Sequence, residues 1–203
     1  MPQEHYFSSK PADDGALRTV KVRLAGRELE VLTAGGVFSP GHLDLGTRVL
    51  LDEVPGPPAT GHVLDLGAGW GPVALTLGLE APDATVWAVD VNERALDLVR
   101  RNATRVGLSN VNAALPDDVP DDLRFAAIWS NPPIRIGKAE LHELLRRWLP
   151  RLEAGATAWL VVQKNLGADS LQRWLAEDLG DGWRVERTAT AKGFRVLAVT
   201  RER

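Results

Sequence analysis

The sequence has no cysteine, and it has only four histidines and one methionine among 203 residues. Without cysteine there is neither a disulfide framework nor a thiolate ligand for zinc, and the scattered histidines form no metal-ligand motif. We therefore expect no metal centre. No apolar run approaches the 18 or so residues that span a bilayer, and no basic-then-apolar leader follows the polar residues 1–3. These absences predict a cytoplasmic protein that does not engage a membrane.

Positive charge is also in short supply, with a formal net charge of −3 and an isoelectric point near 5.8. This balance argues against a protein that holds a long duplex by its phosphates, because such binding depends on clustered lysine and arginine. Two arginine clusters, at 100–105 and 146–151, are interpreted as solvated helix faces. The content of 44% hydrophobic and 25% charged residues is typical of one soluble domain with a modest extension.

Short apolar or β-branched runs alternate with helical periodicity from Asp65 onward, which is typical of βαβ units around a parallel sheet. Strands are predicted at 62–66, 85–90, 111–115, 125–130 and 156–163, helices at 72–79, 93–106, 139–152 and 168–179, and an antiparallel hairpin at 183–190 and 194–200. The predicted fold is α/β, a doubly wound, seven-stranded, mostly parallel sheet.

A smaller unit is predicted before this sheet. Residues 19–24 and 27–32 alternate apolar and polar around Ala25-Gly26, which indicates a β-hairpin. A short helix at 45–54 and a proline-rich linker at 55–60 follow. The chain is therefore divided into an N-terminal extension, 1–60, and a doubly wound core, 61–203.

A glycine-rich turn, Asp65-Leu66-Gly67-Ala68-Gly69-Trp70-Gly71, joins the first core strand to the next helix. Glycines let the backbone approach a ligand closely, and a helix N-terminus favours polar or anionic groups. The Gly-x-Gly-x-Gly spacing is not the dinucleotide fingerprint, so a ligand without a pyrophosphate is favoured. Asp90 ends the second strand, where its carboxylate could accept hydrogen bonds from both hydroxyls of a ribose. Close helix packing for the glycines and a helix cap for Asp90 are the alternatives, although Asn92 already provides that cap.

A second motif, Asn131-Pro132-Pro133-Ile134, directly follows the apolar run 125–129. Asparagine offers a side-chain carbonyl oxygen, and two prolines fix the following backbone while removing two competing N–H donors. A planar NH2 group could dock against these acceptors. The alternative is a stiff turn, since Asn-Pro is a common breaker of regular structure.

These residues resemble the class I S-adenosylmethionine-dependent methyltransferases of the methyltransferase small domain type, which include the RsmC-like ribosomal RNA guanine-N2 methyltransferases. The resemblance extends over residues 6–199, and its matching segments are 36–39, 43–47, 63–71, 89–96, 102–103, 130–133, 137–138 and 193–196.

The resemblance implies that S-adenosylmethionine binds at the carboxyl ends of the first two core strands, partly covered by the extension. It implies that Asn131 and the Pro132 carbonyl hold an exocyclic amine in line with the methyl group, so that positioning supplies most of the acceleration. Cofactor binding is assigned to Phe38, Asp65, Gly67, Ala68, Gly69, Gly71, Asp90, Val91 and Asn131, and substrate binding to Pro133, Ile134 and Lys138.

Three features depart from the family's pattern. The third strand ends in Ala113-Ala114-Leu115, where relatives often have an acidic residue for the adenine amine, so that contact is expected from the backbone or from Asp117. Ile134 stands where Phe or Tyr is frequent, which removes a surface for stacking a base. The best-known members resemble two such domains in tandem, whereas this chain has one.

The expected function is N-methylation of a nucleobase amino group, with guanine N2 of ribosomal RNA as the favoured acceptor and RNA as the partner. A protein glutamine amide, a small-molecule amine, and a cofactor-binding module without activity remain alternatives, and monomer and homodimer both remain open. Trp129, Trp148, Trp174 and Trp183 are expected in the core, whereas Trp70 is left open between core and site.

Overall fold

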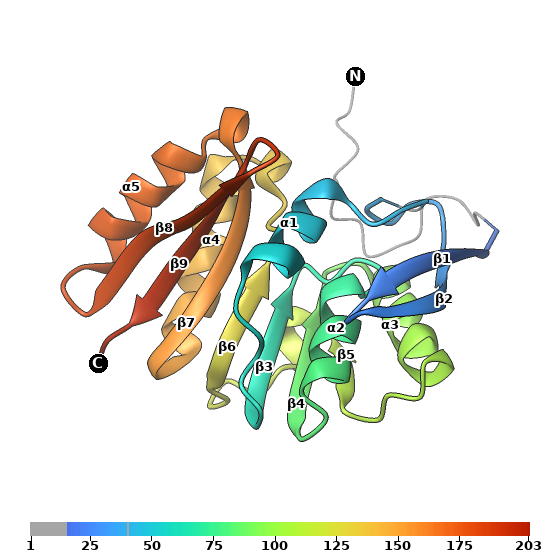
Figure 1. Ribbon diagram of the computed structural model, residues 1–203. Coiled ribbons are helices and arrows are strands. Elements are labelled where there is room, and N and C mark those ends of the chain that lie inside the picture. Colours follow the sequence, from blue (N-terminus) through green and yellow to red (C-terminus); the bar gives the residue numbers. More distant parts are fainter. Residues whose placement is uncertain (1–15, 40) are drawn as a thin grey trace.

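The computed structural model describes residues 16–39 and 41–203, so residues 1–15 and Pro40, with the parts of the predicted extension and of the family resemblance that fall on them, lie outside the described residues. The main sheet has seven strands in the order β5-β4-β3-β6-β7-β9-β8 (Figure 1). Its strands are β3 (Gly61–Leu66), β4 (Ala84–Val89), β5 (Val111–Ala114), β6 (Phe125–Ser130), β7 (Leu152–Gln163), β8 (Trp183–Ala191) and β9 (Phe194–Arg201). The first five strands in this order pair in parallel, and β9 is antiparallel to both of its neighbours. The predicted fold class is confirmed.

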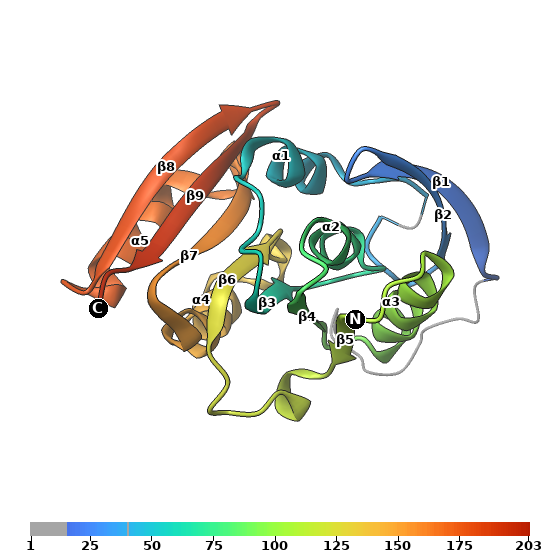
Figure 2. The ribbon, with the colours of Figure 1, turned by 60° about the horizontal axis from the view of Figure 1, so that its bottom comes forward.

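Helices cover both faces of this sheet (Figure 2). They are α1 (Leu45–Glu53), α2 (Pro72–Glu80), α3 (Glu93–Arg105), α4 (Lys138–Trp148) and α5 (Ala168–Leu179). Helices α1, α2 and α3 pack on one face and α4 and α5 on the other. The neighbours Val63 and Leu64 are both fully buried, one in each layer. Two-sided burial explains why the parallel strands read as continuous apolar runs rather than as an alternation.

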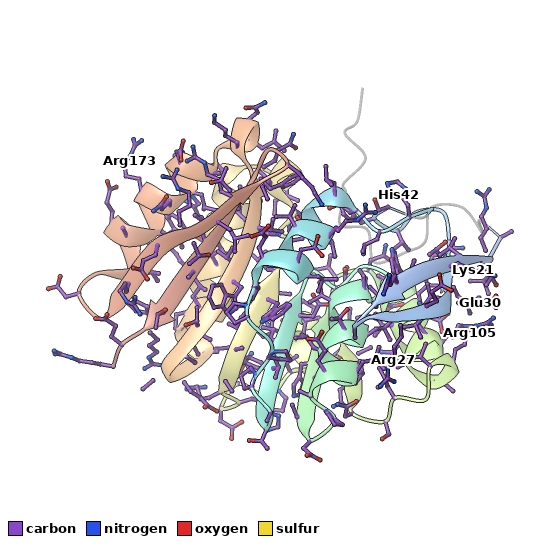
Figure 3. All side chains as sticks on the ribbon, in the orientation of Figure 1. Lys21, Arg27, Glu30, His42, Arg105 and Arg173 are labelled. Carbon is purple, nitrogen blue, oxygen red and sulfur yellow. The ribbon has the colours of Figure 1, made fainter. Side chains whose placement is uncertain are left out.

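The predicted N-terminal hairpin is present as a separate two-stranded sheet, β1 (Arg18–Leu24) and β2 (Arg27–Thr33). Its turn residues Ala25 and Gly26 both have positive φ, of 47° and 72°, which is the turn geometry that matches the twist of a two-residue hairpin. The apolar face of the hairpin packs against α2 and α3. On its outer side, Glu30 lies 3.3 Å from Arg105 of α3 and 3.9 Å from Lys21, a group visible in Figure 3.

One fully buried side chain connects this hairpin to the main domain. The Oδ1 atom of Asn102 in α3 accepts the Leu32 N–H at 2.6 Å, and its Nδ2 donates to the carbonyl oxygens of Leu32 at 2.9 Å and Trp70 at 3.0 Å. A buried amide satisfied on three sides is costly to break, because each freed backbone group would remain buried without a partner. The hairpin, α3 and the glycine turn are therefore held as one unit.

The end of α4 differs from the prediction of a helix over 139–152. Helix α4 ends at Trp148, a short 3-10 helix covers Leu149–Arg151, and Leu152 already begins β7. The reason is Pro150, which has no N–H to continue the helical hydrogen bonds. Three further 3-10 helices, at Pro116–Asp118, Ile134–Ile136 and Lys164–Leu166, had no counterpart in the prediction.

The interpretation of residues 146–151 as a solvated arginine face is wrong for Arg151. This side chain is only 8% exposed, and its guanidinium lies 4.7 Å from the Trp148 ring and 5.2 Å from the Phe125 ring. It also donates hydrogen bonds to the carbonyl oxygens of Pro120 and Leu123. A guanidinium can be buried in this way because it stacks on aromatic rings and is weakly hydrated.

Candidate functional site

A pocket lies where the carboxyl ends of β3 and β6 meet the start of α2 and α1. The residues that line it are Phe38, Ser39, Asp44, Thr47, Asp65, Gly67, Ala68, Gly69, Trp70, Pro72, Val73 and Asn131. Phe38, which lines this pocket, is 51% exposed.

The glycine turn has two functions that can be separated residue by residue. A Cβ on Gly71 would lie 3.1 Å from Val99 Cγ2, so this glycine allows α2 to start close against α3. A Cβ on Gly69 would meet nothing within 4 Å, although its φ of 55° is left-handed. Close packing therefore explains Gly71 but not Gly69. Gly69 presents open backbone to the pocket, which suits close approach of a ligand.

The turn is fastened to the end of β4. The N–H groups of Gly67 and Ala68 both donate to the Val89 carbonyl oxygen, at 2.8 and 3.1 Å. The Gly69 N–H donates to Asp90 Oδ2 at 2.9 Å, and the other carboxylate oxygen accepts the Asn92 N–H at 2.9 Å. Each carboxylate oxygen can accept further hydrogen bonds. Asp90 is thus oriented beside the Gly69 backbone, and both of its oxygens keep capacity for hydroxyl donors.

The helix cap expected from Asn92 is confirmed. Its Oδ1 accepts the Arg94 N–H at 3.0 Å at the start of α3, so Asp90 is not needed as the side-chain cap. The Asn92 Nδ2 also donates to the Gly36 carbonyl oxygen at 3.0 Å, which connects the loop that carries Phe38 to the end of β4. Val91, between these two residues, is half-buried.

Asp65 has an environment that changes its protonation. It is 1% exposed, and its Oδ2 accepts the Ala74 N–H at 2.9 Å from the first turn of α2. Burial raises the pKa of Asp65 from 3.8 to about 8, with the Ala74 hydrogen bond opposing this shift and the charge of Asp90 adding to it. Burial also raises the pKa of Asp90, and the hydrogen bonds from the backbone partly offset that effect. Asp65 is therefore mostly neutral at neutral pH, and it binds β3 to α2.

Asn131 is held by residues from α1. Its Nδ2 donates one hydrogen bond to Asp44 Oδ2 at 2.8 Å and one to Thr47 Oγ1 at 3.1 Å. The same Asp44 oxygen accepts the Thr47 N–H at 3.1 Å and so caps α1. Next to Asn131, the Ser130 hydroxyl donates to the Leu66 carbonyl oxygen at 2.7 Å, which fastens the end of β6 to the end of β3.

The residues after Asn131 form a tight turn. The Pro132 carbonyl oxygen already accepts the Ile134 N–H at 2.8 Å, and the Pro133 carbonyl oxygen accepts the Ile136 N–H at 3.1 Å. Because a carbonyl oxygen has two lone pairs, Pro132 keeps one for a substrate. Ile134 is half-buried and packs against the core cluster on the α4 side, whereas Lys138 is exposed at the start of α4.

Sequence reasoning assigned no role to Asp44, Gly46, Thr47 or Phe194, although their segments were noted in the family resemblance. A Cβ on Gly46 would lie 2.9 Å from Phe194 Cε1, 3.0 Å from Asp44 Oδ2 and 3.2 Å from Asn131 Nδ2. Glycine at this position therefore allows α1, the start of β9 and Asn131 to meet. The available sequence signal was Asp44, because aspartate is a favoured N-cap directly before a helix.

Trp70 and Asp117 make contacts that do not depend on a ligand. Trp70 is 2% exposed and belongs to the cluster beneath the hairpin, as the core alternative expects, and it also lines the pocket. Trp129 and Trp148 are buried as predicted, and Trp174 and Trp183 are partly buried against the core. Asp117, expected as a possible adenine contact, pairs with Arg147 of α4 at 2.7 Å.

No group of three or more histidine and acidic side chains in residues 16–39 and 41–203 is arranged to hold a metal ion. In the same ranges, no helix has the length and apolar character needed to cross a membrane.

The family model described as "Methyltransferase small domain" matches residues 28–198. The chain is 37% identical over 197 residues to an uncharacterized protein, YbxB, of Bacillus subtilis (strain 168), and the alignment covers 96% of each chain. It is 32% identical over 204 residues to the ribosomal RNA small subunit methyltransferase C of Pseudomonas entomophila (strain L48), covering 98% of this chain and 58% of that protein. The chain thus spans little more than half the length of this second relative.

Among solved structures, the fold is similar to a T. thermophilus 16S rRNA N2 methyltransferase (RsmC) in complex with AdoMet and guanosine. The TM-score is 0.75 at 24% identity, and the match covers 96% of this chain and 52% of that one. At this identity the similarity describes the fold.

Proposed function

Because the chain belongs to the methyltransferase small domain family, we propose that it transfers the methyl group of S-adenosylmethionine to an exocyclic amino group of a nucleobase, with guanine N2 of ribosomal RNA as the acceptor. The chain is a methyltransferase, and its cofactor is S-adenosylmethionine. The identity of the acceptor and the role of each residue are what we propose.

The observation that carries the proposal is the orientation of the Asn131 amide. An amide NH2 has two hydrogens, and both are used, by Asp44 and by Thr47. The amide oxygen is then the group left for a ligand, and a carbonyl oxygen selects an N–H donor. An amine held by this oxygen and by the second lone pair of the Pro132 carbonyl would lie near the pocket that we propose for the cofactor.

The cofactor's sulfonium supplies an activated methyl group, so the protein needs no strong base. Asp90 would accept hydrogen bonds from the ribose hydroxyls, and the open backbone at Gly69 would lie against the nucleoside. Asn131 and Pro132 would bind the two hydrogens of the amine, which directs the nitrogen lone pair toward the methyl group. As the N–C bond formed, the S–C bond would break to leave the neutral thioether S-adenosylhomocysteine, and the methylated nitrogen would lose one proton to water. Positioning of this kind can account for about 7–11 kcal/mol of a reaction barrier.

The remaining site residues have supporting roles in the proposal. Phe38 would close over the cofactor, while Gly67, Ala68, Gly71, Asp65 and Val91 would shape its binding surface. Pro133, Ile134 and Lys138 would contact the acceptor side. In the absence of an aromatic residue at 134, the contact to the base would be made by an aliphatic side chain.

The test is methyl transfer from radiolabelled S-adenosylmethionine to three pools in parallel: undermethylated total RNA, protein extract and small-molecule amines. Label in RNA, located to N2-methylguanine after digestion, is the expected result. Label only in the protein or small-molecule pool would replace the acceptor class, and cofactor binding without transfer to any of the three pools would contradict the nucleobase acceptor that we propose.

The variant for this test is Asn131→Ala. Removing the amide that binds the amine should lower turnover about 100-fold or more, the range for loss of one oriented polar group in a transition state. The dissociation constant for the cofactor should stay within a few-fold of wild type. Turnover near normal would mean that the Asn-Pro-Pro segment is only a stiff turn.

A further inference from the structure

We propose that Asp44 and Thr47 are positioning residues that fix which end of the Asn131 amide faces the acceptor. This inference rests on the proposed function for the identity of the amine, but it concerns two residues to which the sequence alone gave no role. It starts from three hydrogen bonds that converge on the N-terminus of α1, two from Asn131 and one from the Thr47 backbone.

The chemistry of the partners determines the orientation. An ionised carboxylate can only accept hydrogen bonds, so the Asn131 atom 2.8 Å from Asp44 Oδ2 has to be the NH2 group. Rotating the amide by half a turn would place oxygen against carboxylate oxygen at that distance. The same rotation would present NH2 to the NH2 of the substrate. Asp44 therefore excludes the orientation that cannot bind an amine.

Thr47 adds a second constraint from the same helix turn. Its Oγ1 accepts the other Nδ2 hydrogen at 3.1 Å, and the residue is only 4% exposed. Two acceptors on two sides of one nitrogen restrict both the rotation of the amide and its displacement. This matters because a misplacement of about 1 Å in a reacting group can lower a rate about 100-fold.

The two acceptors are themselves held rigidly. Asp44 is fixed as the N-cap of α1 through the Thr47 N–H, and the absent side chain of Gly46 lets the helix approach Asn131. Asp44 and Asn131 are 87 residues apart in the sequence. The N-terminus of α1 thus acts as a clamp on a residue that follows a strand of the main sheet.

A pair of substitutions separates positioning from helix capping. Asp44→Ser keeps a good N-cap, but the serine side chain is too short to reach the Asn131 nitrogen. Asp44→Asn keeps an acceptor oxygen that can serve both Thr47 and Asn131. We expect turnover to fall at least tenfold in Asp44→Ser and to stay within about threefold in Asp44→Asn. Thr47→Val, which removes one of the two acceptors, should give an intermediate loss.

The measurements are single-turnover methylation of the best acceptor pool, the dissociation constant for S-adenosylmethionine, and thermal unfolding. The matched control is Asp52→Ser, which also removes an acidic side chain from α1. The Asp52 carboxylate lies 3.6 Å from the Lys192 ammonium and does not pair with Asn131. The control should keep wild-type turnover. Asp44→Ser should keep the melting temperature and cofactor affinity of the control while losing turnover.

Three outcomes would overturn the inference: normal turnover in Asp44→Ser, an equal loss in Asp44→Ser and Asp44→Asn, or a loss explained by unfolding in Asp44→Ser. Asn131→Ala is measured alongside. If Asn131→Ala is inactive while Asp44→Ser is normal, the clamp fails and the proposed function stands. If Asn131→Ala is active, the proposed function itself fails.

Discussion

Binding of the cofactor should release a proton from Asp65. The buried carboxyl is mostly protonated in the free protein, because burial raises its pKa to about 8. S-adenosylmethionine is a cation, and Asp65 lines the pocket in which we propose that it binds. A nearby positive charge favours the ionised carboxylate. The bound state should therefore have a lower pKa at Asp65, and affinity should rise with pH.

The size of the effect follows from the position of that pKa. If the bound-state pKa falls below about 5, the affinity increases by about tenfold, or 1.36 kcal/mol, for each pH unit between that pKa and 8. Between pH 6.0 and 7.5 the expected gain is roughly 25-fold, after allowing for the fraction of Asp65 already ionised at pH 7.5. The comparison ends at pH 7.5 because the α-amino group of the cofactor would itself begin to lose its proton above that pH, since an α-amino group has a pKa of about 7.7–8.0.

Titration calorimetry in two buffers of different ionisation enthalpy measures both the affinity and the number of protons released. About one proton should be released near pH 6.5. Asp65→Asn keeps an oxygen for the Ala74 N–H but cannot titrate, so its affinity should be nearly independent of pH over the same window. Equal affinities of the wild type at pH 6.0 and 7.5, or an unchanged slope in Asp65→Asn, would refute the reasoning.

Three further changes test other parts of the site. Asp90→Ala should weaken S-adenosylmethionine about 10- to 150-fold in calorimetry, the equivalent of about 1.5–3 kcal/mol for hydrogen bonds to a charged group; a change below twofold would mean that Asp90 does not contact the ribose. Gly46→Ala should gain up to about 1 kcal/mol of helix propensity but lose about 1–3 kcal/mol to overpacking against Phe194 and Asn131. Unfolding curves should therefore show a lower free energy of unfolding, and turnover should fall. Ile134→Phe should tighten binding of the proposed RNA acceptor by up to about 1–3 kcal/mol through stacking, measured by RNA titration. A loss of turnover instead would favour an aliphatic acceptor.

The stability of the protein should also depend on Asp65. Its folded-state pKa is raised above the ordinary value, so the folded protein binds more protons than the unfolded chain between about pH 4 and 8. The free energy of unfolding should therefore decrease as pH rises through this window. Asp65→Asn should reduce that decrease, which chemical denaturation at pH 5 and pH 8.5 can measure.

The order of strands and helices could be predicted because its signals are local. The run 125–130 became β6 and the periodic stretch 168–179 became α5, with the predicted boundaries. The helix cap at Asn92 could be predicted for the same reason, because its side chain accepts a hydrogen bond from the N–H only two residues later, at Arg94. The error at 149–152 arose because helical spacing of leucines was given more weight than one proline.

The candidate site could be predicted only in part. The glycine turn and Asn131-Pro132-Pro133 are contiguous motifs, and each follows a strand. The contact between Asn131 and Asp44 depends on how α1 packs on the sheet, and no periodicity or spacing encodes it. Burial of Arg151 was missed for a related reason, because a cluster of arginines gives no sign of which one stacks on Trp148 and Phe125.

The hydrogen bonds of Asn102 have a consequence for the time course of synthesis. The hairpin leaves the ribosome early, but Asn102, which fastens Leu32, is made 70 residues later. At about 5–20 residues per second this is a wait of roughly 4–14 s. In the first half of that interval neither α2 nor α3 has been made, and α3 is still incomplete at its end. A two-stranded hairpin alone is only marginally stable in water. We therefore expect a nascent chain stalled before residue 93 to leave the β1–β2 hairpin open to protease. A chain stalled after the whole of β5 has emerged should protect the hairpin.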